Sequence, residues 1–259
     1  MGFYDLSKEA RAILVEEIHQ AIARNIAEGE TPAILSYFSN EDTYIRKAGY
    51  LAMGRIYMAQ EDQRENIKAQ LLKLLKSHNE KVRQTTINAA GEIGKYHFEA
   101  VSIFFDKGLF DPHHSVRNAV IGSLKKMGQK NPGPTLAWAK GYLNHPDKEI
   151  RREVCHGIEL RGRTHPQDVL PLLEVLQDDA TARVKNTLVH VLGQISYKKG
   201  CLETVIRTLA AWENKELVAK AIDEIVDVHH RYKNFSALTQ QQAIRYIDEN
   251  YWKEHQGTN

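Results

Sequence analysis

Basic residues recur on one side of a series of predicted helices in this sequence. Their type and spacing suit the binding of a charged ligand. Seven lie opposite the apolar stripe of their helix: Lys47, Arg55, Lys95, Lys125, Lys126, Arg152 and Arg163. Three more lie near helix ends: Arg161, Lys198 and Lys199. Asn, Gln and His residues stand between them. Bases interspersed with amides suit a polyanionic backbone, because each phosphate contact releases condensed counterions. These ten bases are therefore predicted to bind nucleic acid.

The sequence offers little for ordinary catalysis or metal binding. His156 and His190 occupy equivalent positions in neighbouring segments, but no cysteine or carboxylate recurs at that offset to complete a ligand set. The sequence contains no Ser-His-Asp pattern, P-loop or dinucleotide fingerprint. We therefore predict no catalytic residue, no metal site and no cofactor.

An internal repeat positions the bases. Five segments share a turn, an apolar anchor followed by a base, and then a helix rich in small residues; a weaker sixth copy follows. The anchors, spaced 37 residues apart once and 34 thereafter, are Ile45, Val82, Val116, Ile150, Val184 and Val218. Apolar or small residues recur at offsets 0, 4, 7, 8 and often 11 from each anchor. This is the period of an amphipathic helix and not the alternation of a strand.

Apolar stretches between the anchor helices, around 67–76, 168–177 and 202–212, are predicted to be the outer helix of each pair. A helix pair of this kind cannot bury its apolar face alone, so the pairs must stack. The sequence thus predicts an all-α fold, an α-solenoid of HEAT-like helical repeats (an α-α superhelix), as a single domain over 1–259. The inner helices are expected near 44–58, 82–95, 116–128, 150–163, 184–199 and 216–230.

Two details of the repeat predict local structure. Gly54, Gly91 and Gly193 recur at offset 9, where a missing side chain lets neighbouring helices approach closely. In HEAT repeats, the base after each anchor commonly forms a ladder with acids or carbonyls of the preceding turns. The bases at this position are Arg46, Arg83, Arg117, Arg151 and Lys185.

The charge distribution is more informative than the net charge of +2. The first five inner helices hold 15 Lys or Arg and three acids, Glu92, Glu153 and Glu159, whereas the remainder holds 20 bases and 30 acids. The expected inner layer is therefore strongly basic.

Composition indicates a folded protein, with 42% hydrophobic and 26% charged residues. No apolar run is long enough to span a membrane, so no membrane association is predicted. The start, MGFYDLSKEAR, lacks the apolar core of a signal peptide. Two cysteines cannot form a disulfide framework, so we expect a cytoplasmic protein.

Within residues 144–251, the stretches EIRR at 149–152, LVAKAI at 217–222 and the segment 238–251 resemble motifs of a known family, the HEAT-like-repeat alkylpurine DNA glycosylases of DNA alkylation repair, and the chain looks like a divergent member. Three stretches carry the likeness. Residues 149–152, EIRR, are similar to the family's W-V-R-R. Residues 217–222, LVAKAI, are similar to F-F-I-x-K-A-I, and residues 238–251 are similar to the family's final L-S-x-R-E-A-I-K-x-I-x-x-N-Y. The resemblance implies a basic concave cleft that wraps duplex DNA.

The departures concern the chemistry of that family. After K-A-I the family has Gly-Trp, an aromatic wall of the lesion cleft, where this chain has Asp223 and Glu224. The family's Trp-Asp pair, whose Asp helps the damaged base to leave, has no counterpart in this sequence. We therefore expect a scaffold that binds duplex DNA without efficient glycosylase activity. Two alternatives stay open: an adaptor for an acidic protein partner, and an active alkylpurine glycosylase with relocated catalytic residues.

Overall fold

The computed structural model describes residues 2–252, in which every regular element is a helix. The chain divides into two compact units, with the boundary between Asn131 and Pro132. The prediction of one domain over 1–259 stays a prediction. Among the helices of the described residues, none is long and apolar enough to cross a membrane.

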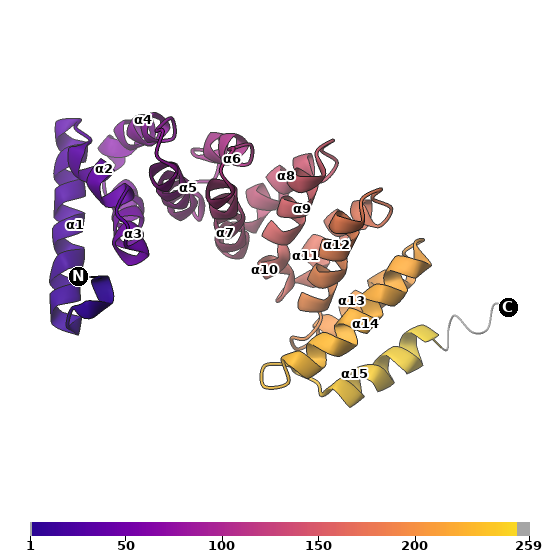
Figure 1. The fold of residues 1–259 in the computed structure, drawn as a ribbon. Coiled ribbons are helices and arrows are strands. Elements are labelled where there is room, and N and C mark those ends of the chain that lie inside the picture. The colour runs from indigo at the N-terminus through magenta and orange to yellow at the C-terminus, as the bar shows by residue number, and fades with distance from the viewer. Residues whose placement is uncertain (1, 253–259) are drawn as a thin grey trace. The chain divides into compact units, whose positions relative to one another are not determined.

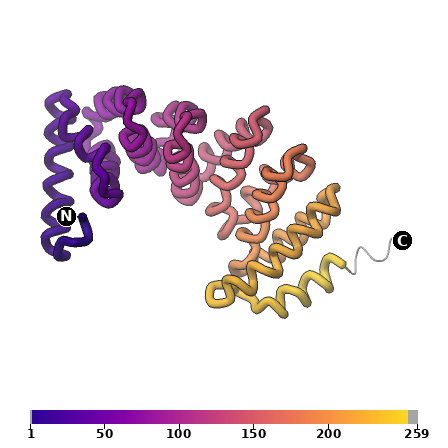
Figure 2. The backbone as a smooth tube through the Cα atoms, viewed as in Figure 1, coloured from indigo at the N-terminus to yellow at the C-terminus, as the bar shows by residue number. Residues whose placement is uncertain are grey.

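The first unit is a double layer of helices (Figures 1 and 2). One layer consists of helices that pack side by side in chain order: α1 (Lys8–Glu28), α3 (Thr43–Ala59), α5 (Glu80–Gly94) and α7 (His114–Lys130). The other layer contains α2 (Pro32–Phe38), α4 (Arg64–Leu74) and α6 (Ser102–Gly108). Two 3₁₀ turns are also present, η1 (Phe3–Asp5) and η2 (Glu61–Gln63). Each outer helix packs on the inner helix that follows it, as the repeat predicts.

The second unit repeats this plan. Its inner layer contains α9 (Lys148–Gly157), the short α10 (Glu159–Gly162), α12 (Ala182–Gln194), α14 (Lys215–Arg231) and α15 (Gln240–Ile247). The other layer contains α8 (Pro132–Tyr142), α11 (Pro166–Leu173) and α13 (Cys201–Ala210). The 3₁₀ turn η3 (Glu174–Leu176) extends α11, and the π-helical turn η4 (Asp248–Trp252) ends the described chain.

The repeat register is confirmed by burial of the anchors. Val82, Val116, Ile150, Val184 and Val218 are each at most 3% exposed, whereas Ile45 is half-buried. Asx side chains begin the inner helices, because an Asx oxygen accepts from a backbone N–H that has no partner within the helix. The capping residues are Asp42, Asn79, Asp147 and Asn214. The solenoid fold that the sequence predicts is therefore confirmed.

The recurrent glycines allow the close approach that their spacing predicts. A Cβ on Gly54 would lie 2.7 Å from Cβ of Glu92, and one on Gly91 would lie 2.7 Å from Cβ of Ser123. A Cβ on Gly193 would lie 2.6 Å from Cγ of Glu224. Each glycine therefore sets the spacing between its helix and the next inner helix.

The ladder of bases exists, with one correction. Arg83 donates to the carbonyls of Ser77 and His78 in its preceding turn, as predicted. The acid, however, belongs to the following turn, because Arg83 also donates to both oxygens of Asp111, at 2.7 and 3.0 Å. We call this arrangement the arginine clamp.

A second arginine clamp occurs in the other unit. Arg151 donates to the carbonyls of His145 and Pro146 and to both oxygens of Asp179. Because one guanidinium holds two successive turns, each clamp ties a repeat to its neighbour.

Two predicted inner helices have different bounds. The helix expected over 150–163 is interrupted at Ile158, directly after Gly157, and continues as α10. The helix expected over 184–199 ends at Gln194. Gly200 adopts a left-handed conformation, with φ of 76°, in the turn that leads to α13. Lys198 and Lys199 consequently lie in this turn and not at the end of a helix.

Candidate nucleic-acid interface

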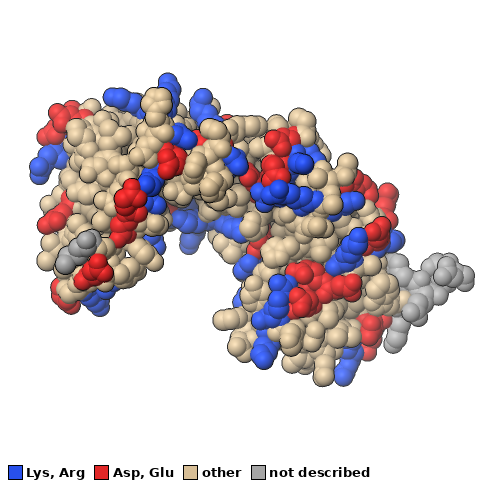
Figure 3. Space-filling view, viewed as in Figure 1, with Lys and Arg blue, Asp and Glu red and all other residues tan. Residues whose placement is uncertain are grey.

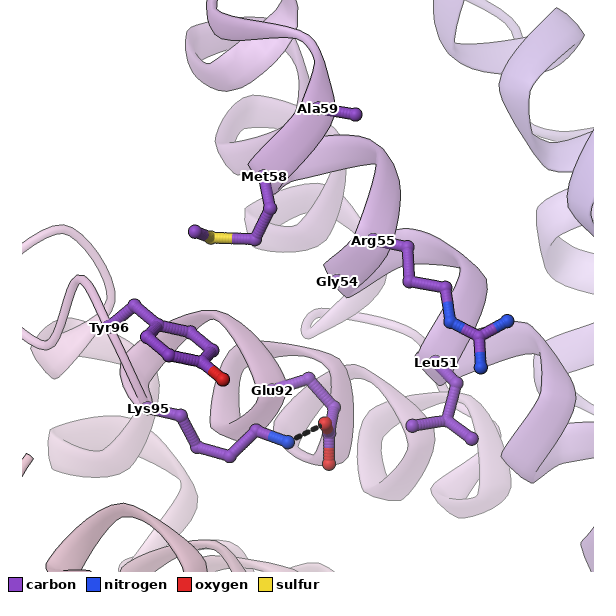
Figure 4. A pocket seen from close by; sticks show the side chains of 8 residues that line it. All are labelled: Leu51, Gly54, Arg55, Met58, Ala59, Glu92, Lys95 and Tyr96. Atoms are coloured by element: carbon purple, nitrogen blue, oxygen red, sulfur yellow. Dashed lines mark hydrogen bonds and ion pairs between the residues drawn. The ribbon is translucent and has the colours of Figure 1, made fainter. Parts of the chain in front are cut away.

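Five of the ten predicted nucleic-acid-binding bases gather on the inner layer of the first unit. Arg55 on α3 and Lys95, which follows α5, line the same hollow of about 520 Å³ (Figure 4). Arg55 also lines a neighbouring hollow of about 260 Å³ together with Lys47. The remaining two bases, Lys125 and Lys126, lie on α7, which packs against α5. The structure thus brings together bases from three successive repeats.

One buried carboxylate organises part of this group. Glu92, whose side chain is 9% exposed, pairs with Lys95 (Figure 4) and, at 3.3 Å, with Nζ of Lys126. Lys126 also lies 5.2 Å from the ring centroid of Tyr50. The backbone of Gly54 lies directly against Glu92, which leaves the carboxylate between two helices. Glu92 therefore fixes the positions of two ammonium groups and neutralises one of their two charges.

Lys47 and Arg55 are exposed, and both lie next to aromatic rings. Tyr4 and Tyr44, which line the hollow that they share, are 60% and 44% exposed. Their rings contact edge to face, with centroids 4.4 Å apart. Stacking on bases is a common use of exposed aromatic side chains beside a basic surface. Sequence analysis did not identify these two tyrosines as part of a candidate site, because Tyr4 precedes the repeats and no aromatic residue recurs at the position of Tyr44.

The first unit is strongly polarised between three of its inner helices, α3, α5 and α7, and the rest, which includes α1. Residues 43–59, 80–95 and 114–130 hold ten bases and only two acids, Glu80 and Glu92. The remainder of the unit holds eight bases and 14 acids. The face drawn in Figure 3, by contrast, carries interspersed Lys, Arg, Asp and Glu. The excess of positive charge is therefore a property of α3, α5 and α7, since α1 holds three bases and four acids.

The predicted bases of the second unit are more fully paired. Arg152 pairs with Glu149 at 2.9 Å and with Glu153 at 3.4 Å. Arg163 pairs with the buried carboxylate of Glu159. Both bases lie on the inner layer, but the acids that surround them lower its positive potential.

The other three predicted bases of this unit lie elsewhere. Arg161 donates to Asp168 of α11, which turns its guanidinium toward the other layer. Lys198 and Lys199 line a hollow of about 420 Å³ beside the turn that precedes α13. The ammonium of Lys198 lies 4.9 Å from the ring centroid of Tyr197. The structure therefore does not gather these three with Arg152 and Arg163.

The inner layer of the second unit is also less basic than the first five predicted helices suggest. Over 148–163, 182–194 and 215–231 it holds ten bases and seven acids. Four of these acids belong to the sixth inner helix, α14: Glu216, Asp223, Glu224 and Asp227. Glu224 is held by Arg231, and its Oε1 lies 3.6 Å from Nδ1 of His190. Asp223 is exposed.

Sequence analysis missed a group of three side chains in this unit. Ligand atoms of His156, Glu159 and His190 all lie within 4.8 Å of one another. The 34-residue spacing already indicated that the two imidazoles were neighbours. The signal for the carboxylate was the His-x-x-Glu spacing in 156–159, which places the two side chains on one face of a helix.

Comparison with known proteins identifies the fold. No protein-family model and no curated protein matches the chain. Among solved structures, AlkD2 from Streptococcus mutans is 17% identical over 79% of this chain and 97% of that one, with a TM-score of 0.51. Smu.31 from Streptococcus mutans UA159 is 17% identical over 80% and 97% of the two chains, with a TM-score of 0.46.

An archaeal HEAT-like repeat protein from Thermococcus onnurineus NA1 is 16% identical over 86% of this chain and 98% of that one, with a TM-score of 0.38. At these identities the likenesses concern the fold alone. The likeness to AlkD2, together with the stacked helix pairs, shows that this chain is an α-solenoid of HEAT-like repeats.

Proposed function

We propose that this protein is a helical-repeat scaffold that binds duplex nucleic acid through its phosphate backbone. The contacts are made chiefly by the inner layer of the first unit, with Lys47, Arg55, Lys95, Lys125 and Lys126. The observation that carries the proposal is the ten bases against two acids on α3, α5, α7 and the residue after α5. Such a surface attracts a polyanion at long range and gains free energy from counterion release on contact.

The charges suggest how strongly binding depends on salt. Lys47 and Arg55, with one net charge from Lys95 and Lys126 beside Glu92, give about three charges for phosphates, so the log–log salt slope is expected near −3. Contacts of this kind do not read base sequence, so affinity is expected to be similar for unrelated duplexes. Arg152 and Arg163 add less, because acids already surround them.

The test is fluorescence anisotropy of a labelled duplex over a range of salt concentrations. Lys47→Gln combined with Arg55→Gln removes two exposed bases that make no ion pair with any described residue. It should flatten the slope by about 2 without changing the thermal unfolding curve. The matched control is Lys73→Gln combined with Lys107→Gln, which removes two exposed bases from α4 and α6 in the outer layer. This control should leave the slope nearly unchanged.

Two outcomes would contradict the proposal: no binding at low salt, and equal effects of the two double variants. Displacement of bound duplex by polyglutamate tests whether an acidic protein segment uses the same surface. Stronger binding to polyglutamate than to duplex would favour an adaptor that takes an acidic partner.

The thiols of Cys155 and Cys201 are both free and buried, which suits a reducing compartment such as the cytoplasm.

The proposal includes no efficient release of alkylated bases. In this chain Glu224 follows Asp223 in place of an aromatic wall, and its carboxylate is engaged by Arg231. A carboxylate held by a guanidinium offers no ring face for stacking on a base. It is also less available to stabilise positive charge on a sugar than an unpaired carboxylate.

A further inference from the structure

The inner layer of the second unit contains two imidazoles and a carboxylate that converge. His156 is on α9, Glu159 begins α10, and His190 is on α12, which packs against α9. Nε2 of His156 lies 3.0 Å from Oε2 of Glu159. The two imidazole centroids are 6.2 Å apart, with planes inclined by 70°, so the rings meet edge to face and are not stacked. One ligand atom from each of the three side chains lies within 4.8 Å of the others.

The distances between these ligand atoms are close to those in a metal site. Ligands bonded at 2.0–2.2 Å in tetrahedral geometry are about 3.4 Å apart, so the most distant pair must close by about 1.4 Å or less. The His156 and His190 side chains are 36% and 44% exposed, which leaves room for that rotation. Glu159 is 1% exposed and therefore provides a fixed point to which the imidazoles can move.

The surrounding contacts orient the three side chains. Arg163 donates to Oε1 of Glu159, which leaves Oε2 on the side of His156. Nδ1 of His190 lies 3.6 Å from Glu224, so a small movement gives a carboxylate–imidazole hydrogen bond that presents Nε2 to a metal. Such outer carboxylates are typical partners of metal-binding histidines.

The cluster opens to a hollow of about 470 Å³ lined by His156, His190, Arg152, Arg183, Asn186 and Thr187. Three protein ligands leave at least one coordination position for water or another small ligand. That position would face the hollow, where hydrogen-bond donors are close by.

We propose that His156, His190 and Glu159 bind one divalent transition-metal ion. Two imidazoles and one carboxylate are the ligand set of many zinc sites and of non-haem Fe²⁺ sites. This inference does not depend on nucleic-acid binding, because its residues lie in the second unit and its test uses metal alone.

The test is isothermal titration of the chelator-treated full chain with Zn²⁺, repeated with Co²⁺ to record the visible absorption of the bound ion. The expected result is saturable binding of one ion per chain, with a Co²⁺ spectrum of four- or five-coordinate geometry. His156→Ala and His190→Ala should each weaken binding about tenfold or more, because each removes a direct ligand. Glu159→Gln should also weaken it.

The matched control is His114→Gln, which removes an exposed imidazole that stacks on His113 at 4.7 Å in the first unit. It should leave affinity and stoichiometry unchanged. Far-ultraviolet circular dichroism shows whether each variant is folded; the two half-exposed histidines keep the test valid if Glu159→Gln unfolds the chain. Absence of saturable binding, or binding that survives His156→Ala combined with His190→Ala, overturns the proposal. A loss in His114→Gln equal to that in His190→Ala also overturns it.

Discussion

Replacing Arg151 by Met tests whether the arginine clamps join neighbouring repeats energetically. The guanidinium donates to both oxygens of Asp179, at 2.5 and 3.0 Å, and to the carbonyls of His145 and Pro146, at 2.7 and 3.0 Å. The Arg151 and Asp179 side chains are 15% and 5% exposed. Met keeps much of the apolar stem but leaves a buried carboxylate without its cation. Breaking a buried pair in this way costs about 3–5 kcal/mol in free energy of unfolding.

The loss in free energy of unfolding caused by Arg151→Met should depend on pH. Burial raises the pKa of Asp179, but the bonds from Arg151 and Thr181 together with the charge of Arg151 outweigh it, so the pKa lies below its ordinary value. A lowered pKa in the folded state contributes stability above the unfolded value of about 3.9, and this contribution is lost as pH falls through the folded pKa. In Arg151→Met the effect of burial prevails and the pKa rises. The difference between wild type and variant should therefore be largest near neutral pH and shrink on acidification.

The assay is urea unfolding followed by circular dichroism at several pH values between about 3 and 7. Lys148→Met, an exposed base on the same helix, is the matched control and should change stability by no more than about 0.5 kcal/mol. Arg151→Met combined with Asp179→Asn should be more stable than Arg151→Met alone, since no buried charge is left unpaired. A loss below about 1 kcal/mol, or one that does not change with pH, would refute the reasoning.

Two further predictions follow from the helix spacing and from the acids of α14. Gly91→Ala should destabilise by about 1–3 kcal/mol in thermal or urea unfolding, because its Cβ would lie 2.7 Å from Cβ of Ser123. Gly122→Ala, with nothing within 4 Å of the added atom, should be neutral or stabilise by up to about 1 kcal/mol; equal losses would contradict the spacing role. Excess protein should release no 7-methylguanine or 3-methyladenine from duplex above the spontaneous rate, as measured by chromatography of free base. Release that Glu224→Gln abolishes would show instead that this carboxylate is catalytic.

The fold could be predicted from the sequence because each repeat has a local amphipathic pattern. Val82 and Val116, 34 residues apart, are buried at equivalent places, and the helix around each needs only a 3.6-residue period to be recognised. The break at Ile158 was not predicted, since Gly157 and Gly162 weaken a helix without specifying where it ends.

The candidate sites were less predictable because they depend on which side-chain rotamers meet across helices. Nothing in the repeat indicates that Arg161 turns toward Asp168 of α11. The carboxylate that joins His156 and His190 is in the same helical segment, but the interruption at Ile158 lies between it and His156. Its spacing from His156 is a signal, but no other repeat among the first five has a carboxylate at that offset, so the repeat pattern by itself could not identify it.

The arginine clamps also bear on how such a chain can change in length. Arg83 and Asp111 are 28 residues apart, as are Arg151 and Asp179, and each guanidinium must reach two turns at once. An insertion or deletion within either turn would move carbonyl or carboxylate away from the guanidinium. Added residues are better accommodated where an inner helix leads to the next outer helix, as in the segment 95–101, which lies between α5 and α6. Natural variation in repeat length is therefore expected to accumulate at one end of the helix pairs, while the clamped end keeps its length.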